Sequence, residues 1–214
     1  MLKLKYINSK FMIKTLVLNA SLKHKDNEQP SNTEELAQLV LDNMAKHGDI
    51  DSEIVRLADY QIDVGLGFKE SQSDQWPEIV EKIKAADVVI FATPIWWGQR
   101  SSLMQRVIER MDAFDEEYIA GGRSALLGKV AGIVVTGSED GAQHVIGSIL
   151  EVLTFMNFTI PPQAACYWVG EVGDDPKKER EKRLQSKAAP HMAESLGKSL
   201  VQFANLLKSN PLNE

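Results

Sequence analysis

Short apolar runs alternate with amphipathic segments along most of this chain, and this alternation constrains the fold more than any other feature. Residues 87–93 and 129–136 are nearly continuous apolar runs, which is typical of strands covered on both faces. Residues 101–111, between them, place apolar side chains at helical spacing. Strand and helix alternate five times. This pattern predicts an α/β fold with a doubly wound, five-stranded parallel sheet inside a three-layer αβα sandwich.

The composition is that of one ordinary globular domain. Of the 214 residues, 43% are hydrophobic and 25% are charged, and no break in composition divides them. We expect the domain to span residues 12–214. The first predicted strand begins just after Met12, so residues 1–11 are interpreted as an N-terminal extension.

Charge, hydropathy and cysteine content exclude several classes of protein. The net charge of −6 argues against a nucleic-acid partner, because binding phosphates requires a basic surface. No apolar run is long enough to span a bilayer, and the N-terminal segment lacks the features of a signal peptide, so we expect no membrane association and a cytoplasmic location. The single cysteine, Cys166, excludes an intrachain disulfide, and we expect no metal site.

The segment 14–44 has the form of a strand, a polar loop and a helix. Its apolar run at 15–18 leads into a loop that contains Lys23 and Lys25, and the helix begins at Ser31-Asn32-Thr33. A helix N-terminus carries unpaired N–H groups and a partial positive charge. A lysine-bearing, hydroxyl-rich loop before such an N-terminus favours an anion, most often a phosphate.

Two further loops follow predicted strands, at 94–98 and 136–141. In parallel sheets, ligands bind beyond the carboxyl ends of the strands. The loop 94–98 contains two adjacent tryptophans, and the loop 136–141 is rich in small and polar residues. A ligand in contact with all three loops would carry a phosphate and a flat ring, which is the shape of FMN.

Three motifs in these loops resemble those of the flavodoxin-like NAD(P)H-dependent FMN reductases. The phosphate-loop motif is similar to residues 19–23 followed by Ser31-Asn32-Thr33. The second motif resembles Thr93-Pro94-Ile95-Trp96-Trp97-Gly98, and the third resembles residues 136–141. The resemblance covers most of the chain and implies the strand order 2-1-3-4-5. The cysteine-rich motif of the related iron–sulfur flavoproteins is absent.

The resemblance also implies a role for each of the three loops. It assigns the FMN phosphate to Ser21, Lys23, Ser31, Asn32 and Thr33, and the isoalloxazine ring to Pro94, Ile95, Trp96, Trp97 and Gly98. The other edge of the ring would contact Thr136, Gly137, Ser138 and Gly141. No residue is nominated as an acid–base or covalent catalyst, because the cofactor carries the chemistry.

The function implied is that of an FMN-dependent oxidoreductase. NADPH or NADH would act as a transient co-substrate, and a quinone or free flavin would accept the electrons. Relatives pair their subunits, so a homodimer or homotetramer is expected. Neither the acceptor nor the preference between the two nucleotides can be derived from the sequence, and the effect of the acidic Glu139 and Asp140 on the flavin potential is also open.

Two alternatives remain at this point. The first is an electron-carrier flavodoxin, which the acidic composition favours slightly and which rapid NAD(P)H oxidation would exclude. The second is a flavin-free α/β module that binds a phosphoester, because a serine or threonine at a helix start is most often only a cap.

Two polar segments carry no clear pattern. Residues 112–128 are interpreted as an irregular connection between a helix and a strand. The basic cluster 177–183 is interleaved with glutamates and is interpreted as a solvated face.

Overall fold

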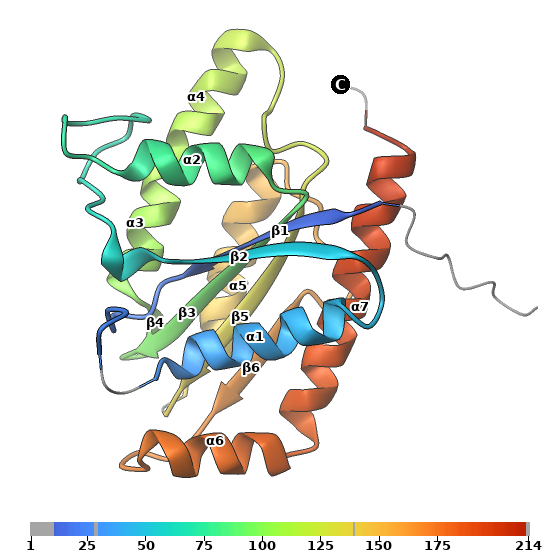
Figure 1. Cartoon of the computed structure of the whole chain (residues 1–214). Coiled ribbons are helices and arrows are strands. Elements are labelled where there is room, and N and C mark those ends of the chain that lie inside the picture. The colour runs from blue at the N-terminus through green and yellow to red at the C-terminus, as the bar shows by residue number, and fades with distance from the viewer. Residues whose placement is uncertain (1–10, 28–29, 139, 213–214) are drawn as a thin grey trace, which may run out of the picture.

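The structure is a computed structural model that describes residues 11–27, 30–138 and 140–212 (Figure 1). The predicted N-terminal extension lies outside the described residues, apart from Phe11. The domain boundary at Met12 therefore stays a prediction. Within the described residues, no helix combines the length and the apolar character that crossing a membrane requires.

A parallel sheet runs through the centre of the fold, in the order β2-β1-β3-β5-β6. A short strand that was not predicted, β4, pairs antiparallel with the end of β3. The five parallel strands taken alone follow the predicted order 2-1-3-4-5, and β4 changes only the numbering. The strands are β1 (Ile13–Asn19), β2 (Ile50–Arg56), β3 (Val88–Trp96), β4 (Gln99–Arg100), β5 (Val130–Gly137) and β6 (Ala165–Val169).

Helices cover both faces of the sheet, which confirms the predicted three-layer architecture (Figure 1). Two of them, α1 (Asn32–Met44) and α7 (Ala188–Ser209), pack on one face. The other face is covered by α2 (Trp76–Ala85), α3 (Ser102–Arg110), α4 (Asp112–Gly121) and α5 (Ala142–Phe155). A 3-10 turn, η1 (Leu57–Asp59), follows β2, and α6 (Pro176–Gln185) follows β6.

Alternate residues of the central strands enter separate cores. In β3, Val89 and Phe91 belong to the core beneath α2, α3 and α5, whereas Val88 and Ile90 belong to the core beneath α1 and α7. Successive side chains of a strand point to opposite faces, so a strand between two helical layers must be apolar throughout. This is why β3 and β5 were recognisable as continuous apolar runs.

Both segments without a clear pattern contain a helix, so the interpretation of residues 112–128 as an irregular connection is wrong. Residues 112–121 form α4, and its Phe114 is buried beside Phe68 with the ring centroids 5.0 Å apart. The basic cluster lies in α6, where Lys177, Lys178 and Arg180 are exposed, as a solvated face requires, but Arg183 is only 2% exposed. In both cases tertiary contacts stabilise a helix that has little amphipathic pattern of its own.

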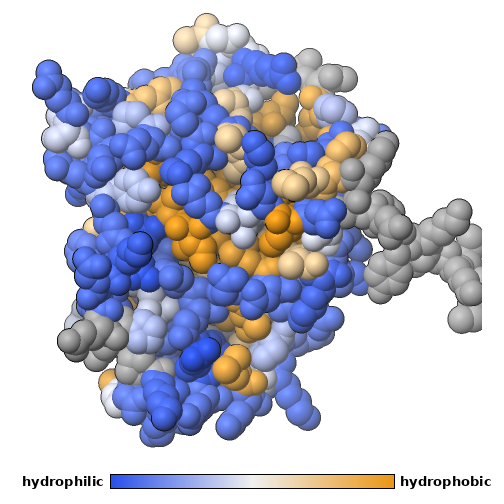
Figure 2. Space-filling view, in the orientation of Figure 1, coloured by the Kyte–Doolittle hydropathy of each residue, from blue (hydrophilic) through white to orange (hydrophobic). Residues whose placement is uncertain are grey.

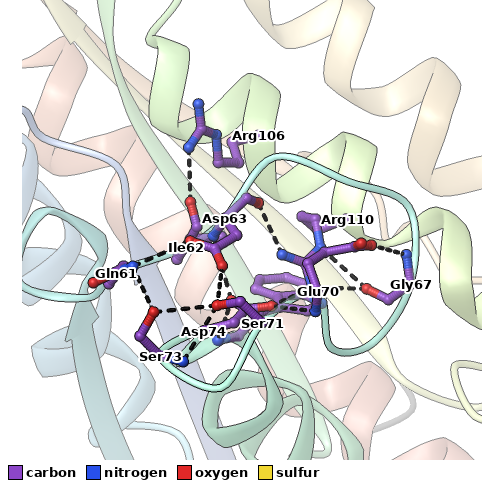
Figure 3. A network of polar contacts seen from close by, with 11 residues as sticks. Gln61, Ile62, Asp63, Gly67, Glu70, Ser71, Ser73, Asp74, Arg106 and Arg110 are labelled. Atoms are coloured by element: carbon purple, nitrogen blue, oxygen red, sulfur yellow. Dashed lines mark hydrogen bonds and ion pairs between the residues drawn. The ribbon is translucent and has the colours of Figure 1, made fainter.

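The connection between β2 and α2 is irregular, and hydrogen bonds from buried side chains fix its conformation (Figure 3). The fully buried guanidinium of Arg110 donates to the carbonyl oxygens of Asp63 (2.8 Å) and Gly67 (2.7 Å), and to Asp74 Oδ2 (2.8 Å). Arg106 donates to the Ile62 carbonyl at 2.7 Å. These bonds satisfy backbone groups that have no strand or helix partner.

The strand β2 forms one edge of the sheet and is protected by charge. Its residues Asp51 and Glu53 are exposed, and Glu53 forms an ion pair with Lys82 of α2 at 2.6 Å. Figure 2 shows hydrophobic residues between α1 and α2 on this face, surrounded by a largely hydrophilic surface. Charged side chains on an edge strand discourage pairing with another chain.

Candidate functional site

A cavity of about 260 Å³ lies at the carboxyl edge of the sheet, where the three predicted loops meet. The loop after β1, the start of α1 and the ends of β3 and β5 contribute most of its wall, and α6 contributes one residue. The lining residues are Ser21, Leu22, Lys23, Asn32, Thr33, Pro94, Ile95, Trp96, Thr136, Gly137, Ser138 and Glu179.

The loop after β1 is shaped by buried polar side chains. Asn19 is fully buried; its Oδ1 accepts from the backbone N–H of Ser21 (3.1 Å), and its Nδ2 donates to Glu34 Oε2 (2.8 Å). Ser31 is the N-cap of α1, and its Oγ accepts from the Glu34 N–H at 3.2 Å. The loop therefore returns to the start of α1 in a defined conformation.

Groups suited to an anion gather at this helix start. Asn32 and Thr33 occupy the first turn of α1 and line the cavity with Ser21 and Lys23. The first N–H groups of a helix have no partner within the helix, and they carry its positive partial charge. The Lys23 ammonium donates to the Pro30 carbonyl at 3.1 Å, which holds it at the mouth of the same loop. This arrangement can bind a phosphate.

Buried hydroxyl groups join the three loops to one another. Thr33 Oγ1 and Thr136 Oγ1 are 2.7 Å apart, which links α1 to the end of β5. Ser101 Oγ donates to the Ala20 carbonyl (2.8 Å), and the Ser101 N–H donates to Thr93 Oγ1 (3.1 Å). The cavity walls are therefore held together by short polar contacts instead of by flexible loops alone.

The second and third loops touch at two glycines. A Cβ atom added at Gly137 would lie 2.9 Å from Ile95 Cβ, and one added at Gly141 would lie 2.9 Å from Gly98 Cα. Such distances are too short for a side chain. Glycine at these positions allows the two loops to close one side of the cavity.

The aromatic pair lies on a tight hairpin between β3 and β4. Trp97 and Gly98 form its two-residue turn, with φ angles of 51° and 73°. Both residues require positive φ in such a turn, and a bulky residue adopts this conformation only under strain. Trp96 is 50% exposed at the cavity and Trp97 is 85% exposed at the tip. The hairpin therefore presents two indole rings to solvent.

The structure brings ten of the fourteen predicted site residues into the cavity wall and leaves four outside it. Ser31 lies behind the wall as the helix cap. Trp97 lies at the hairpin tip, and Gly98 and Gly141 contact each other next to the cavity. Glu139 lies outside the described residues.

Glu179 of α6 was missed by the sequence analysis. It is 6% exposed, lines the cavity, and accepts a hydrogen bond from the Asn32 side-chain amide. Burial raises the pKa of Glu179, while Arg183 and Lys23 act in the opposite direction. No local pattern distinguishes this glutamate from its neighbours in a highly charged segment, so only the tertiary structure identifies it.

The fold is that of a flavodoxin-like α/β protein with a cavity at the carboxyl edge of its sheet. The sequence model of the NADPH-dependent FMN reductase family matches residues 13–172, about three quarters of the chain, and this chain belongs to that family. The predicted family and fold are therefore confirmed. Membership of this family favours the predicted FMN-dependent oxidoreductase over the electron-carrier and flavin-free alternatives.

A curated relative is 8-demethyl-8-aminoriboflavin-5'-phosphate synthase from Streptomyces davaonensis, which is 34% identical over 173 residues. The match covers 77% of this chain and 66% of that relative, so the chain spans slightly less than two thirds of its length.

Two solved structures share the fold. The structure of RosB with bound 8-demethyl-8-formylriboflavin-5'-phosphate has a TM-score of 0.81 and is 28% identical, covering 94% of this chain and 82% of that one. An apo NADH:FMN oxidoreductase has a TM-score of 0.63 and is 18% identical, covering 94% of this chain and 92% of that one. The second likeness concerns the fold alone.

The residues of the cavity suit FMN in both their chemistry and their placement. Hydroxyl, amide and ammonium groups cluster at the start of α1, and Trp96 of the aromatic hairpin lines the same cavity. The volume of about 260 Å³ is close to the lower end of the roughly 300–1,000 Å³ usual for ligand pockets. A flavin with its phosphate inside this cavity would leave part of its ring exposed next to the tryptophans.

Proposed function

We propose that this protein transfers reducing equivalents from NADPH or NADH, through bound FMN, to a small acceptor such as a quinone or free flavin. The observation that carries the proposal is the cavity that is lined both by the polar start of α1 and by the exposed Trp96 of the aromatic hairpin. When bound, FMN supplies the redox chemistry by accepting a hydride and passing electrons to the acceptor. The protein binds and orients it.

Four side chains at the first loop would hold the phosphate: Ser21, Lys23, Asn32 and Thr33. Ser31 supports them by fixing the start of α1. A phosphate here would accept hydrogen bonds from the first N–H groups of α1 and would lie at the positive end of the helix dipole. Both interactions favour a negative charge. The phosphate thereby positions the rest of the flavin relative to the second and third loops.

The ring would lie between two loops. Pro94, Ile95 and Trp96 line the cavity from the first of these loops, and Thr136, Gly137 and Ser138 line it from the second, next to the first. The two loops pack against each other next to the ring, where the hairpin turn of Trp97 and Gly98 meets Gly141. Because the tryptophans are largely exposed, the nicotinamide and a small acceptor can reach the same ring face in turn.

The exposed hairpin also supports a homodimer or homotetramer as the working form. Two adjacent indole rings in solvent expose an apolar surface that a second subunit could cover. A cytoplasmic location and the absence of nucleic-acid partners remain predictions from the sequence.

Titration of the apoprotein with FMN, followed by flavin fluorescence, tests the site. We expect tight quenching in the wild type and at least a tenfold weaker affinity in the Ser21→Ala/Asn32→Ala variant. Ser52→Ala, on the exposed edge strand, is the matched control and should bind as the wild type does. Equal affinities in all three proteins would contradict the assignment of the phosphate to this loop.

Rapid mixing of the reduced holoprotein with different acceptors tests the finer part of the proposal. A quinone or free flavin should reoxidise the bound FMN faster than dissolved oxygen does. If neither acceptor is faster than oxygen, the proposed acceptor class is wrong, although the cofactor assignment would stand.

A second candidate function is the chemical modification of a riboflavin phosphate. It is favoured by the 34% identity to a synthase of a modified riboflavin 5'-phosphate. In this case the flavin in the cavity would be a substrate instead of a cofactor. Mass spectrometry of the flavin recovered after aerobic incubation with an amino donor distinguishes the two functions, because a cofactor is recovered unchanged, whereas a substrate is converted.

A further inference from the structure

The side chain of Glu179 lies inside the subsite that the proposed function assigns to a phosphate. Its carboxylate accepts from Asn32 Nδ2 and lines the cavity with Ser21 and Lys23. It comes from α6, which lies beyond residues 13–172 that the family model matches. A negatively charged group therefore shares donors with the expected anion, and it belongs to a segment outside the matched family region.

Contacts on two sides hold Glu179 in this position. A Cβ atom at Gly170 would lie 3.0 Å from Glu179 Cγ, so the end of β6 packs closely behind the side chain. One turn further along α6, Arg183 donates to Glu35 of α1 and to Asn32 Oδ1, the second contact at 3.4 Å. The helix is thereby fixed against the start of α1, and the carboxylate is part of the cavity wall.

A phosphate dianion and a carboxylate cannot share these donors without cost. Like charges in close contact disfavour the charged form of one of them, so one group takes up a proton or the two separate. The charged groups that face Glu179 are Lys23 from the first loop, Arg183 from α6 and Asp174 from the segment before α6. Glu35 of α1 is already paired with Arg183. Burial raises the pKa of Glu179, so a proton is available to it more readily than to an exposed glutamate.

We propose that Glu179 is an internal competitor of the ligand phosphate, so that a flavin phosphate binds with the uptake of one proton and exchanges more readily than in a site without this carboxylate. This inference rests on the proposed function. A protonated Glu179 would donate a hydrogen bond to a phosphate oxygen, whereas an ionised Glu179 would repel it. Riboflavin, which has no phosphate, should not be affected.

The test compares FMN and riboflavin binding between pH 7 and pH 9 in the wild type, Glu179→Gln and Glu181→Gln. In this range a phosphate monoester with a second pKa near 6 is already a dianion, so its own titration contributes little. Glutamine keeps the size of the side chain and removes the charge. Glu181 is an exposed neighbour on the same helix and serves as the matched control.

In the wild type we expect the dissociation constant of FMN to rise with pH, by up to about tenfold per unit, and we expect riboflavin binding to stay constant. Glu179→Gln should bind FMN at least tenfold more tightly at pH 8 and lose most of the pH dependence. Glu181→Gln should match the wild type. Calorimetry in two buffers of different ionisation enthalpy should count about one proton taken up by the wild type and almost none by Glu179→Gln.

Two outcomes would overturn the inference while leaving the proposed function intact. One is FMN binding that Glu179→Gln leaves unchanged or weakens, which would indicate a purely structural role. The other is a wild-type proton count close to zero. If neither the wild type nor Glu179→Gln binds FMN at any pH, the proposed function fails and this inference fails with it.

Discussion

A single buried ion pair determines the conformation of the long loop between β2 and α2 (Figure 3). Neither side chain of the Arg110–Asp74 pair is exposed. Burial raises the pKa of Asp74, but hydrogen bonds from Arg110 and from the backbone N–H groups of Glu70, Trp76 and Asp63 outweigh this effect and lower the pKa from 3.8 to about 2. The pair is stable because both partners are fully hydrogen-bonded.

Replacement of Asp74 by asparagine should destabilise the protein by about 2 kcal/mol or more at neutral pH, because a pKa lowered by roughly two units corresponds to about that energy. A depressed carboxyl pKa contributes stability above the unfolded pKa, and this contribution is lost as the pH falls. The difference in unfolding free energy between wild type and Asp74→Asn should therefore shrink between about pH 4 and pH 2. Urea denaturation at several pH values measures it. Asp42→Asn, exposed on α1, is the control, and an equal loss in both variants would contradict the account.

Trp97 adopts a conformation that its side chain disfavours, and replacing it should stabilise the protein. A left-handed backbone costs an ordinary residue roughly 1–2 kcal/mol, whereas asparagine tolerates it. Since Trp97 is 85% exposed, Trp97→Asn loses little burial and should raise the free energy of unfolding by up to about 1 kcal/mol. Trp96→Asn, at a half-buried position without positive φ, should do the opposite. Urea denaturation of both variants measures the change in the free energy of unfolding. A decrease in Trp97→Asn would contradict this prediction.

At the scale of single elements, the sequence predicted those features that depend on residues close together in the chain. Ser31 caps α1, at the helix start that the sequence predicted. The helices α4 and α6 were not predicted, because Phe114 and Arg183 are buried by partners far away in the sequence. Glu179 was missed for the same reason, since its contact with Asn32 spans 147 positions.

Ser101 should contribute more to stability than a typical helix cap. Its Oγ accepts from the Met104 N–H at the start of α3 and donates to the Ala20 carbonyl of the first loop. Ser101→Ala removes both bonds, so we expect a loss of about 1–3 kcal/mol and weaker FMN binding. Ser102→Ala, an exposed neighbour in the same helix, should have little effect on either. Thermal unfolding measures the loss of stability, and flavin titration measures the loss of FMN affinity. Unchanged flavin binding in Ser101→Ala would contradict the proposed effect of Ser101 on the first loop.

At the scale of the whole molecule, the three-layer architecture was predictable because it depends on hydrophobic periodicity repeated over the entire chain, whereas the strand order was implied by the resemblance to the FMN reductases. The meeting of the three loops followed from the same reasoning, since strands of one parallel sheet end at one edge. The hairpin β3–β4 was not predicted. Its two-residue turn contains Trp97 where asparagine or aspartate is usual, so the common turn signal is absent.

The charged edge of the sheet should keep the molecule from associating through β2. Asp51→Val combined with Glu53→Val removes both exposed carboxylates and the ion pair with Lys82. We expect this variant to form larger species as its concentration rises, because an uncharged, β-branched edge can pair with another chain. Light scattering after size-exclusion chromatography detects such species. Asp51→Asn/Glu53→Gln keeps the edge polar and should behave more nearly as the wild type does.

The most direct test of the central claim is the anaerobic addition of one equivalent of NADPH to the FMN-loaded protein, with the flavin absorbance followed in time. The account predicts that the yellow colour bleaches within a single turnover, and that free FMN under the same conditions stays oxidised over that time. A tightly bound flavin that neither NADPH nor NADH bleaches would contradict the account.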